Sequence, residues 1–181
     1  MILGEHLDVA ATLHFVGLAL KEKAGISQER RMVVFDEALK HVARSLQIRR
    51  GVLEALGPTS SQSPGETAIH KHGAKELYDL LMSVVENLYD LAMLHGIRRE
   101  WGLARDLLKE ALSTLDSATN VFLNQRKHPD RSRILPQEFK AWKANIWHRV
   151  AVIEAASGNC KEAIKGRENM FWSSRSQLGR C

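Results

Sequence analysis

The stretch "LYDLAMLHGIRREWGLARDLLKEAL", residues 88 to 112, decides the fold prediction. Its small residues Ala92, Ala104 and Ala111 recur among large apolar ones, and Trp101 follows a short polar break. Small residues at matching heights on two antiparallel helices let the helix axes approach to about 8–10 Å, while neighbouring large side chains fill the grooves beside them. The stretch therefore predicts a helical hairpin that bends just before Trp101.

The composition is that of a globular domain with a basic surface. The chain has 181 residues, 44% hydrophobic and 26% charged, with a formal net charge of +5. This size predicts a single domain, 1–181, able to bury a core. Two cysteines without metal-site spacing indicate a reducing compartment. We expect the cytoplasm, or an organelle matrix if a transit peptide has been removed. The start lacks the order of a signal peptide, and we expect no membrane insertion.

Apolar residues recur at helical spacing almost throughout the chain. They lie three or four apart in 9–20, 32–56, 77–94, 103–122 and 139–156, and no segment shows the alternation of a half-buried strand. We therefore expect an all-α fold. Gly, Pro and Ser concentrate in 57–66, and a basic segment with two prolines occupies 125–136, where Pro136 is expected to open a helix. These breaks predict three hairpins, approximately 8–56, 68–124 and 137–172.

The small residues repeat between hairpins. Ala104 follows Ala92 by twelve positions, and Ala163 follows Ala151 by the same interval. The first hairpin shows a similar arrangement from Gly17 onward, with the pieces about nine residues further apart because of an insertion around "KAGISQERR". One structural unit is thus expected to occur three times.

These repeats resemble the tetratricopeptide repeat family. The middle hairpin matches its pattern of large, large, small, aromatic, small, large and small residues, in the order Leu88, Leu91, Ala92, Trp101, Ala104, Leu108, Ala111. The junctions "LGEHLDVA", "LGPTSSQSPGETA" and "KHPDRSR" are similar to connectors of the longer kinesin-light-chain type. The resemblance implies a TPR-like α-solenoid of about three antiparallel helix pairs. It also suggests that the chain is a piece of a longer repeat array.

Two features depart from the family pattern. Equivalent alanines of successive hairpins are 66 and 59 positions apart, against about 34 in the family, which implies long helices or insertions. In the third repeat Arg167 and Met170 replace a large apolar and a small residue. We expect its second helix to be frayed or to form a terminal cap.

The resemblance implies a non-catalytic scaffold or adaptor that binds a partner protein or peptide in a concave groove lined by the first helix of each hairpin. Leu18, Met93 and Val152 fit packing positions equally well. The Lys and Asn residues by which some family members hold a peptide carboxylate are not reproduced, so such a ligand is not expected. The implied groove residues are His14, Leu18, Lys21, Tyr89, Met93, Asn145, His148 and Val152.

No catalytic motif is visible, so the sequence predicts neither an enzyme nor a cofactor or metal site. His70 and His72 are expected to be a solvated pair, because residues two apart diverge on a helix. Cys160 is expected at a hairpin turn as a partly buried small residue rather than a nucleophile.

Nucleic-acid binding is the alternative function. The segment "NQRKHPDRSR" could form a phosphate-binding stripe with four other arginines, Arg49, Arg50, Arg98 and Arg99. However, Trp101, Trp142 and Trp147 lie at spacings that favour core packing over base stacking. A structural subunit of a larger complex, including an enzyme whose chemistry is contributed elsewhere, is a further alternative.

Overall fold

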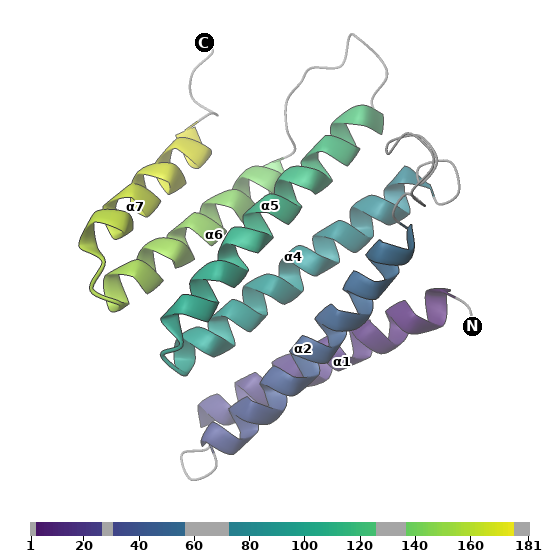
Figure 1. Cartoon of the computed structure of the whole chain (residues 1–181), viewed down its shortest axis with the longest axis horizontal. Helices are drawn as coiled ribbons and strands as arrows, with labels where there is room; N and C mark the ends of the chain where they lie inside the picture. The colour runs from purple at the N-terminus through teal and green to yellow at the C-terminus, as the bar shows by residue number, and fades with distance from the viewer. Residues whose placement is uncertain (1–2, 27–30, 57–72, 126–136, 176–181) are drawn as a thin grey trace.

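The computed structural model describes residues 3–26, 31–56, 73–125 and 137–175 (Figure 1). These stretches contain six α-helices and no strand, which confirms the all-α prediction for this part of the chain. None of these helices is both long and apolar enough to cross a membrane. The predicted linkers, the histidine pair and the helix start at Pro136 lie outside the described residues. The helices are α1 (Leu3–Ile26), α2 (Arg31–Leu56), α4 (Ala74–Ile97), α5 (Trp101–Gln125), α6 (Gln137–Ala156) and α7 (Cys160–Arg175).

The helices pack as three successive pairs. α1 packs on α2, α4 on α5, and α6 on α7, while α2 contacts α4 and α5 contacts α6. Consecutive hairpins therefore lie side by side, with α1 and α2 at one edge of the molecule and α7 at the other (Figure 1). This packing of helix pairs is consistent with a helical repeat.

Small residues lie where paired helices cross, and at Gly17 the sequence pattern predicts this. A Cβ atom added to Gly17 would lie 2.5 Å from Val42 Cγ2 and 3.1 Å from the Ala38 carbonyl oxygen. At the crossing of α6 and α7, a Cβ atom on Gly166 would lie 3.1 Å from Ala151 Cβ. The helix axes approach closely at both crossings because these glycines have no side chain.

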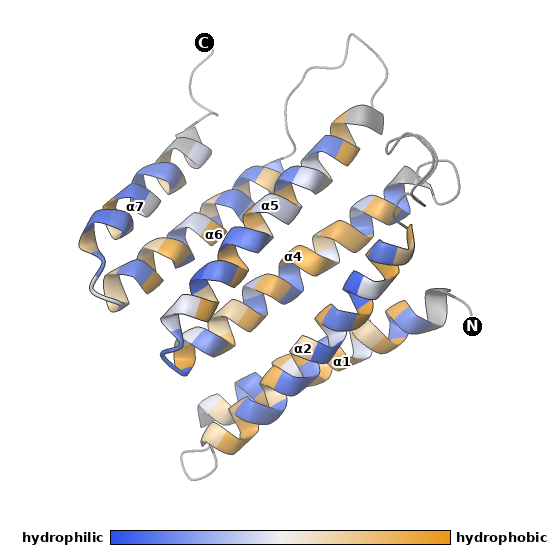
Figure 2. Cartoon of the chain, in the orientation of Figure 1, coloured by the Kyte–Doolittle hydropathy of each residue, from blue (hydrophilic) through white to orange (hydrophobic). Residues whose placement is uncertain are grey.

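The core is densest in the middle hairpin. Leu88, Ala92, Ala104, Leu108 and Ala111 are all completely buried. The three tryptophans at positions 101, 142 and 147 pack against this core and are partly buried, as their spacing predicts. α4 is mostly apolar, whereas α7 is mostly hydrophilic (Figure 2). Burial is thus greatest in the middle hairpin and decreases toward α7.

The third hairpin closes with a tight turn. Gly158 adopts a φ of 84°, which glycine reaches without steric cost. α7 then runs without a break to Arg175, so its fraying is not observed, although Arg167 is exposed and Met170 is only half-buried. Cys160 opens α7 and is exposed, so its expected partial burial is wrong. It lies outside the close crossing at Gly166, and solvent therefore reaches it.

Candidate partner-binding surface

The predicted groove residues lie on the first helix of each hairpin, but they differ in exposure. His14 on α1 is buried, at 6% relative exposure. Four are half-buried, namely Leu18 and Lys21 on α1 and Tyr89 and Met93 on α4. The three on α6 are exposed, namely Asn145, His148 and Val152. Only the α6 residues are therefore widely accessible to a partner.

A polar cluster joins α1 to α4. His14 Nε2 lies 3.0 Å from one carboxylate oxygen of Asp90, and Lys21 Nζ donates a hydrogen bond of 3.1 Å to the other. His14 and Lys21 are seven positions apart, so they project from the same face of α1. Asp90 thus binds His14 and Lys21, two of the predicted groove residues, in a contact between the first and the middle hairpin.

The ionised form of Asp90 is favoured in this cluster. Burial opposes ionisation of the carboxyl, but the hydrogen bonds and charges of His14 and Lys21 outweigh it, and the pKa of Asp90 lies below its ordinary value of 3.8. The charged pair with Lys21 is shielded, since the side chains are only 23% and 17% exposed. This junction is therefore electrostatically satisfied without a ligand.

A second, aromatic junction joins α4 to α6. Arg149 Nε donates a hydrogen bond of 2.9 Å to the Tyr89 hydroxyl. The Tyr89 ring meets the Trp142 ring edge-on, with centroids 5.7 Å apart. Edge-to-face contacts stabilise such pairs beyond their buried area. The Tyr89 side chain is consequently engaged by the third hairpin.

Carboxylates collect on the first-helix side of α4 and α6. Loss of solvation raises the pKa of Glu86 above 4.5, and the charges of Asp90 and Glu138 add to this effect while His14 and Arg49 oppose it. Burial also raises the pKa of Tyr78 above 10.0, reinforced by the charges of Glu138 and Asp79. For Glu86 the opposing charges of His14 and Arg49 exceed those of Asp90 and Glu138, so burial is the main cause of both shifts.

The predicted residues on α6 form one exposed stripe. Asn145, His148 and Val152 are spaced by three and four positions, so they lie on one face of the helix. The side chain of Val152 is 45% exposed, which leaves an apolar group in contact with solvent. The packing face of the same helix is supplied by other residues, Ile146, Val150 and Ile153, which are buried. In the described part of the chain, the packing of α6 therefore depends on residues other than the stripe.

The residues that bridge the hairpins were not predicted from the sequence. Asp90, Trp142 and Arg149 make these contacts, but their partners are 53 to 76 positions away. The helical period places each residue on a face, whereas its partner depends on how the hairpins stack. The only signal for Asp90 was its place beside Tyr89, on the side of α4 that carries Glu86.

The described members of the proposed basic stripe mostly have protein partners. Arg49 is buried and donates a hydrogen bond of 2.8 Å to the Ser83 carbonyl oxygen. Arg50 pairs with Glu110, and Arg98 pairs with Asp36 at 2.8 Å. Carboxylates partly neutralise Arg50 and Arg98, and Arg49 is buried, which weakens the case for phosphate binding. The rest of the stripe, 126–133, lies outside the described residues.

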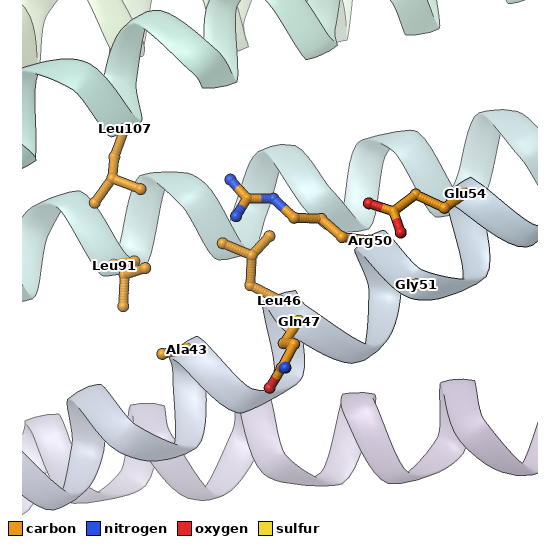
Figure 3. A pocket seen from close by; sticks show the side chains of 8 residues that line it. All are labelled: Ala43, Leu46, Gln47, Arg50, Gly51, Glu54, Leu91 and Leu107. Carbon is orange, nitrogen blue, oxygen red and sulfur yellow. The ribbon is translucent and has the colours of Figure 1, made fainter.

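A cavity opens on the second-helix side of the molecule. It has a volume of about 490 Å³, and its wall includes apolar side chains of α2, α4 and α5, namely Leu46, Leu91 and Leu107 (Figure 3). Arg50 and Glu54 line the same cavity. None of the predicted groove residues lines it. Among the described residues, no group of three or more His, Cys, Asp or Glu residues is placed to bind a metal ion.

Comparisons with known proteins do not identify a relative. No family model matches the chain, and no curated protein sequence matches it.

Proposed function

We propose that this protein is a helical-repeat scaffold of the tetratricopeptide kind that binds another protein and performs no chemistry itself. Three features support the proposal: helix pairs that follow one another in order, glycine at the crossings of two pairs, and contacts that connect the first helices of neighbouring hairpins. Such stacks present a continuous surface that can take a peptide or a helix.

The exposed stripe on α6 is the observation that carries the proposal. His148 and Val152 combine a polar ring with an apolar group, and Asn145 adds an amide that can donate and accept hydrogen bonds. The stripe is free for a partner because other residues of α6 provide its packing face. Tyr89 supports α6 through its contacts with Arg149 and Trp142.

The test replaces two stripe residues and keeps a matched control. We expect the double variant His148→Glu and Val152→Glu to lose binding by about 2 kcal/mol or more, because introduced carboxylates oppose an apolar contact and alter the charge. The control carries Ser113→Glu and Asn120→Glu on the exposed side of α5. Proteins captured from a native lysate are identified by mass spectrometry, and the affinity of the purified partner is then measured for all three chains.

Two results would contradict the scaffold proposal. Equal affinity of both variants and the unaltered chain would place the partner on another face. Capture of RNA, with retention on a polyanion column that falls steeply as salt increases, would favour the nucleic-acid alternative. Circular dichroism of each variant confirms that the helices are intact.

A further inference from the structure

The outer face of α1 is apolar although no described helix covers it. Phe15 is 70% exposed, Val9 is 52% exposed and Val16 is 39% exposed. Thr12 and Ala19 are also exposed between them. α1 thus has apolar residues both toward α2 and away from it, a distribution typical of a helix with neighbours on two sides.

The equivalent faces of α4 and α6 are both covered. Gly17 corresponds to Ala92 and Ala151 in the repeat, so Thr12, Val16 and Ala19 correspond to Asn87, Leu91 and Leu94 on α4. Asn87 donates a hydrogen bond of 3.2 Å to the Val42 carbonyl oxygen of α2, and Leu91 and Leu94 are buried. On α6 the equivalent residues are buried as well, namely Ile146, Val150 and Ile153. Only α1 leaves this face without a helix in the described part of the chain.

The residues on this face are arranged symmetrically about the middle of the helix. Asp8 and Lys23 are equally distant from the midpoint between Phe15 and Val16, and so are Thr12 and Ala19. With 3.6 residues per turn, these six residues fall within less than half of the helix circumference. A second α1 in antiparallel orientation would place Asp8 opposite Lys23, and Thr12 opposite Ala19.

We propose that the outer face of α1 is a dimer interface, on which α1 of a second copy of this chain packs in antiparallel orientation about a twofold axis near Phe15 and Val16. A twofold interface requires a self-complementary surface, and this face provides opposite charges at its two ends, small residues between them and an apolar centre. The small residues let the helices approach, and the central side chains fill the space beside them. The inference is independent of the stripe on α6.

The first test measures mass in solution. Light scattering after gel filtration should give about twice the chain mass of 20.4 kDa. Phe15→Glu places two charges at the centre of the interface, and we expect it to weaken dimerisation by about a hundredfold or more. The matched control is Ile164→Glu, at an apolar residue on α7 that is also widely exposed, and it should remain dimeric. Circular dichroism checks that each variant is helical.

The second test uses charge exchange and does not depend on Phe15. Asp8→Lys brings the introduced ammonium group against Lys23 of the other copy, and Lys23→Asp brings two carboxylates together. Each should raise the dissociation constant about tenfold or less, and the double variant should restore it.

Register is checked by cross-linking in a Cys160→Ser and Cys181→Ser background. Thr12→Cys in one copy should form a disulfide with Ala19→Cys in another, whereas Thr12→Cys alone leaves the sulfurs about 10 Å apart along the axis.

Several results would overturn the dimer. A mass of 20.4 kDa at every concentration would show that α1 does not pair. A dimer that survives Phe15→Glu would use another face. Loss of assembly in both Phe15→Glu and Ile164→Glu would indicate end-to-end stacking of α7 on α1, which produces open filaments rather than a closed pair. Failure of the charge exchange to restore the dimer would contradict the antiparallel register.

Discussion

The middle and C-terminal hairpins share one pattern but differ in how much they bury. In α5, Ala104, Leu108 and Ala111 are completely buried. The equivalent positions of α7 are Ala163, which is 8% exposed, Arg167, which is exposed, and Met170, which is half-buried. α5 lies between α4 and α6, whereas α7 contacts mainly α6. A repeat in the middle of a stack has two neighbours to pack against, and its sequence is constrained accordingly.

The largest expected effect is a loss of stability, measured at equivalent positions of α5 and α7. Leu108→Ala should lower the free energy of unfolding by about 2–5 kcal/mol, because it leaves a cavity in a fully buried site. Arg167→Ala should change it by about 0.5 kcal/mol or less, since the side chain is exposed. Urea unfolding of both variants measures the two values. Similar losses of stability for Leu108→Ala and Arg167→Ala would mean that the two hairpins are packed equally, which would contradict the difference in burial.

A smaller loss of stability is expected when a larger side chain is placed at the crossing of α4 and α5. Ala104→Leu adds three carbon atoms at a site with no exposure, and the strain should cost about 1–3 kcal/mol. Ser113→Leu is the matched control, because it adds a leucine to the exposed side of the same helix. An unchanged urea midpoint for Ala104→Leu would contradict the close approach of the helices there.

The hairpins themselves were predictable because their signals are local. Ala92 and Ala104 mark the contact of α4 with α5 through the helical period alone, and both are completely buried. The turn before Trp101 follows from a short polar break, and α5 begins at that residue. The all-α prediction and the packing of helices as pairs therefore required no knowledge of distant contacts.

The candidate site was less predictable because it depends on how the hairpins stack. His14 and Tyr89 project from the expected helices, but the structure joins each to a neighbouring hairpin through Asp90 or Arg149. A groove position and a contact between hairpins have the same helical period, so the sequence does not separate them. The crossing of α6 and α7 at Gly166 was also missed, since it depends on the rotation of α7 about its own axis.

The junctions on either side of the middle hairpin provide the last comparison, because one is ionic and the other is not. The ionised Asp90 is stabilised by His14 and Lys21, so Asp90→Asn should lower the free energy of unfolding by about 1–2 kcal/mol near neutral pH. Tyr89→Phe is the matched variant at the adjacent residue. It removes only the hydrogen bond from Arg149 and keeps the ring against Trp142, and it should cost about 1 kcal/mol.

The stabilities of these two variants should respond differently to acidic pH. The pKa of Asp90 is lower in the folded chain than its ordinary value of 3.8. The stability that the ionised carboxylate contributes is therefore complete above pH 3.8 and is lost as pH falls through the lower pKa of the folded chain. The difference in free energy of unfolding between the unaltered chain and Asp90→Asn should therefore shrink as pH falls below 3.8. The corresponding difference for Tyr89→Phe should stay constant. Urea unfolding from neutral to acid pH measures both differences. A constant deficit for Asp90→Asn would mean that its carboxylate is not stabilised by the cluster, and that α1 and α4 are held together by apolar contacts alone.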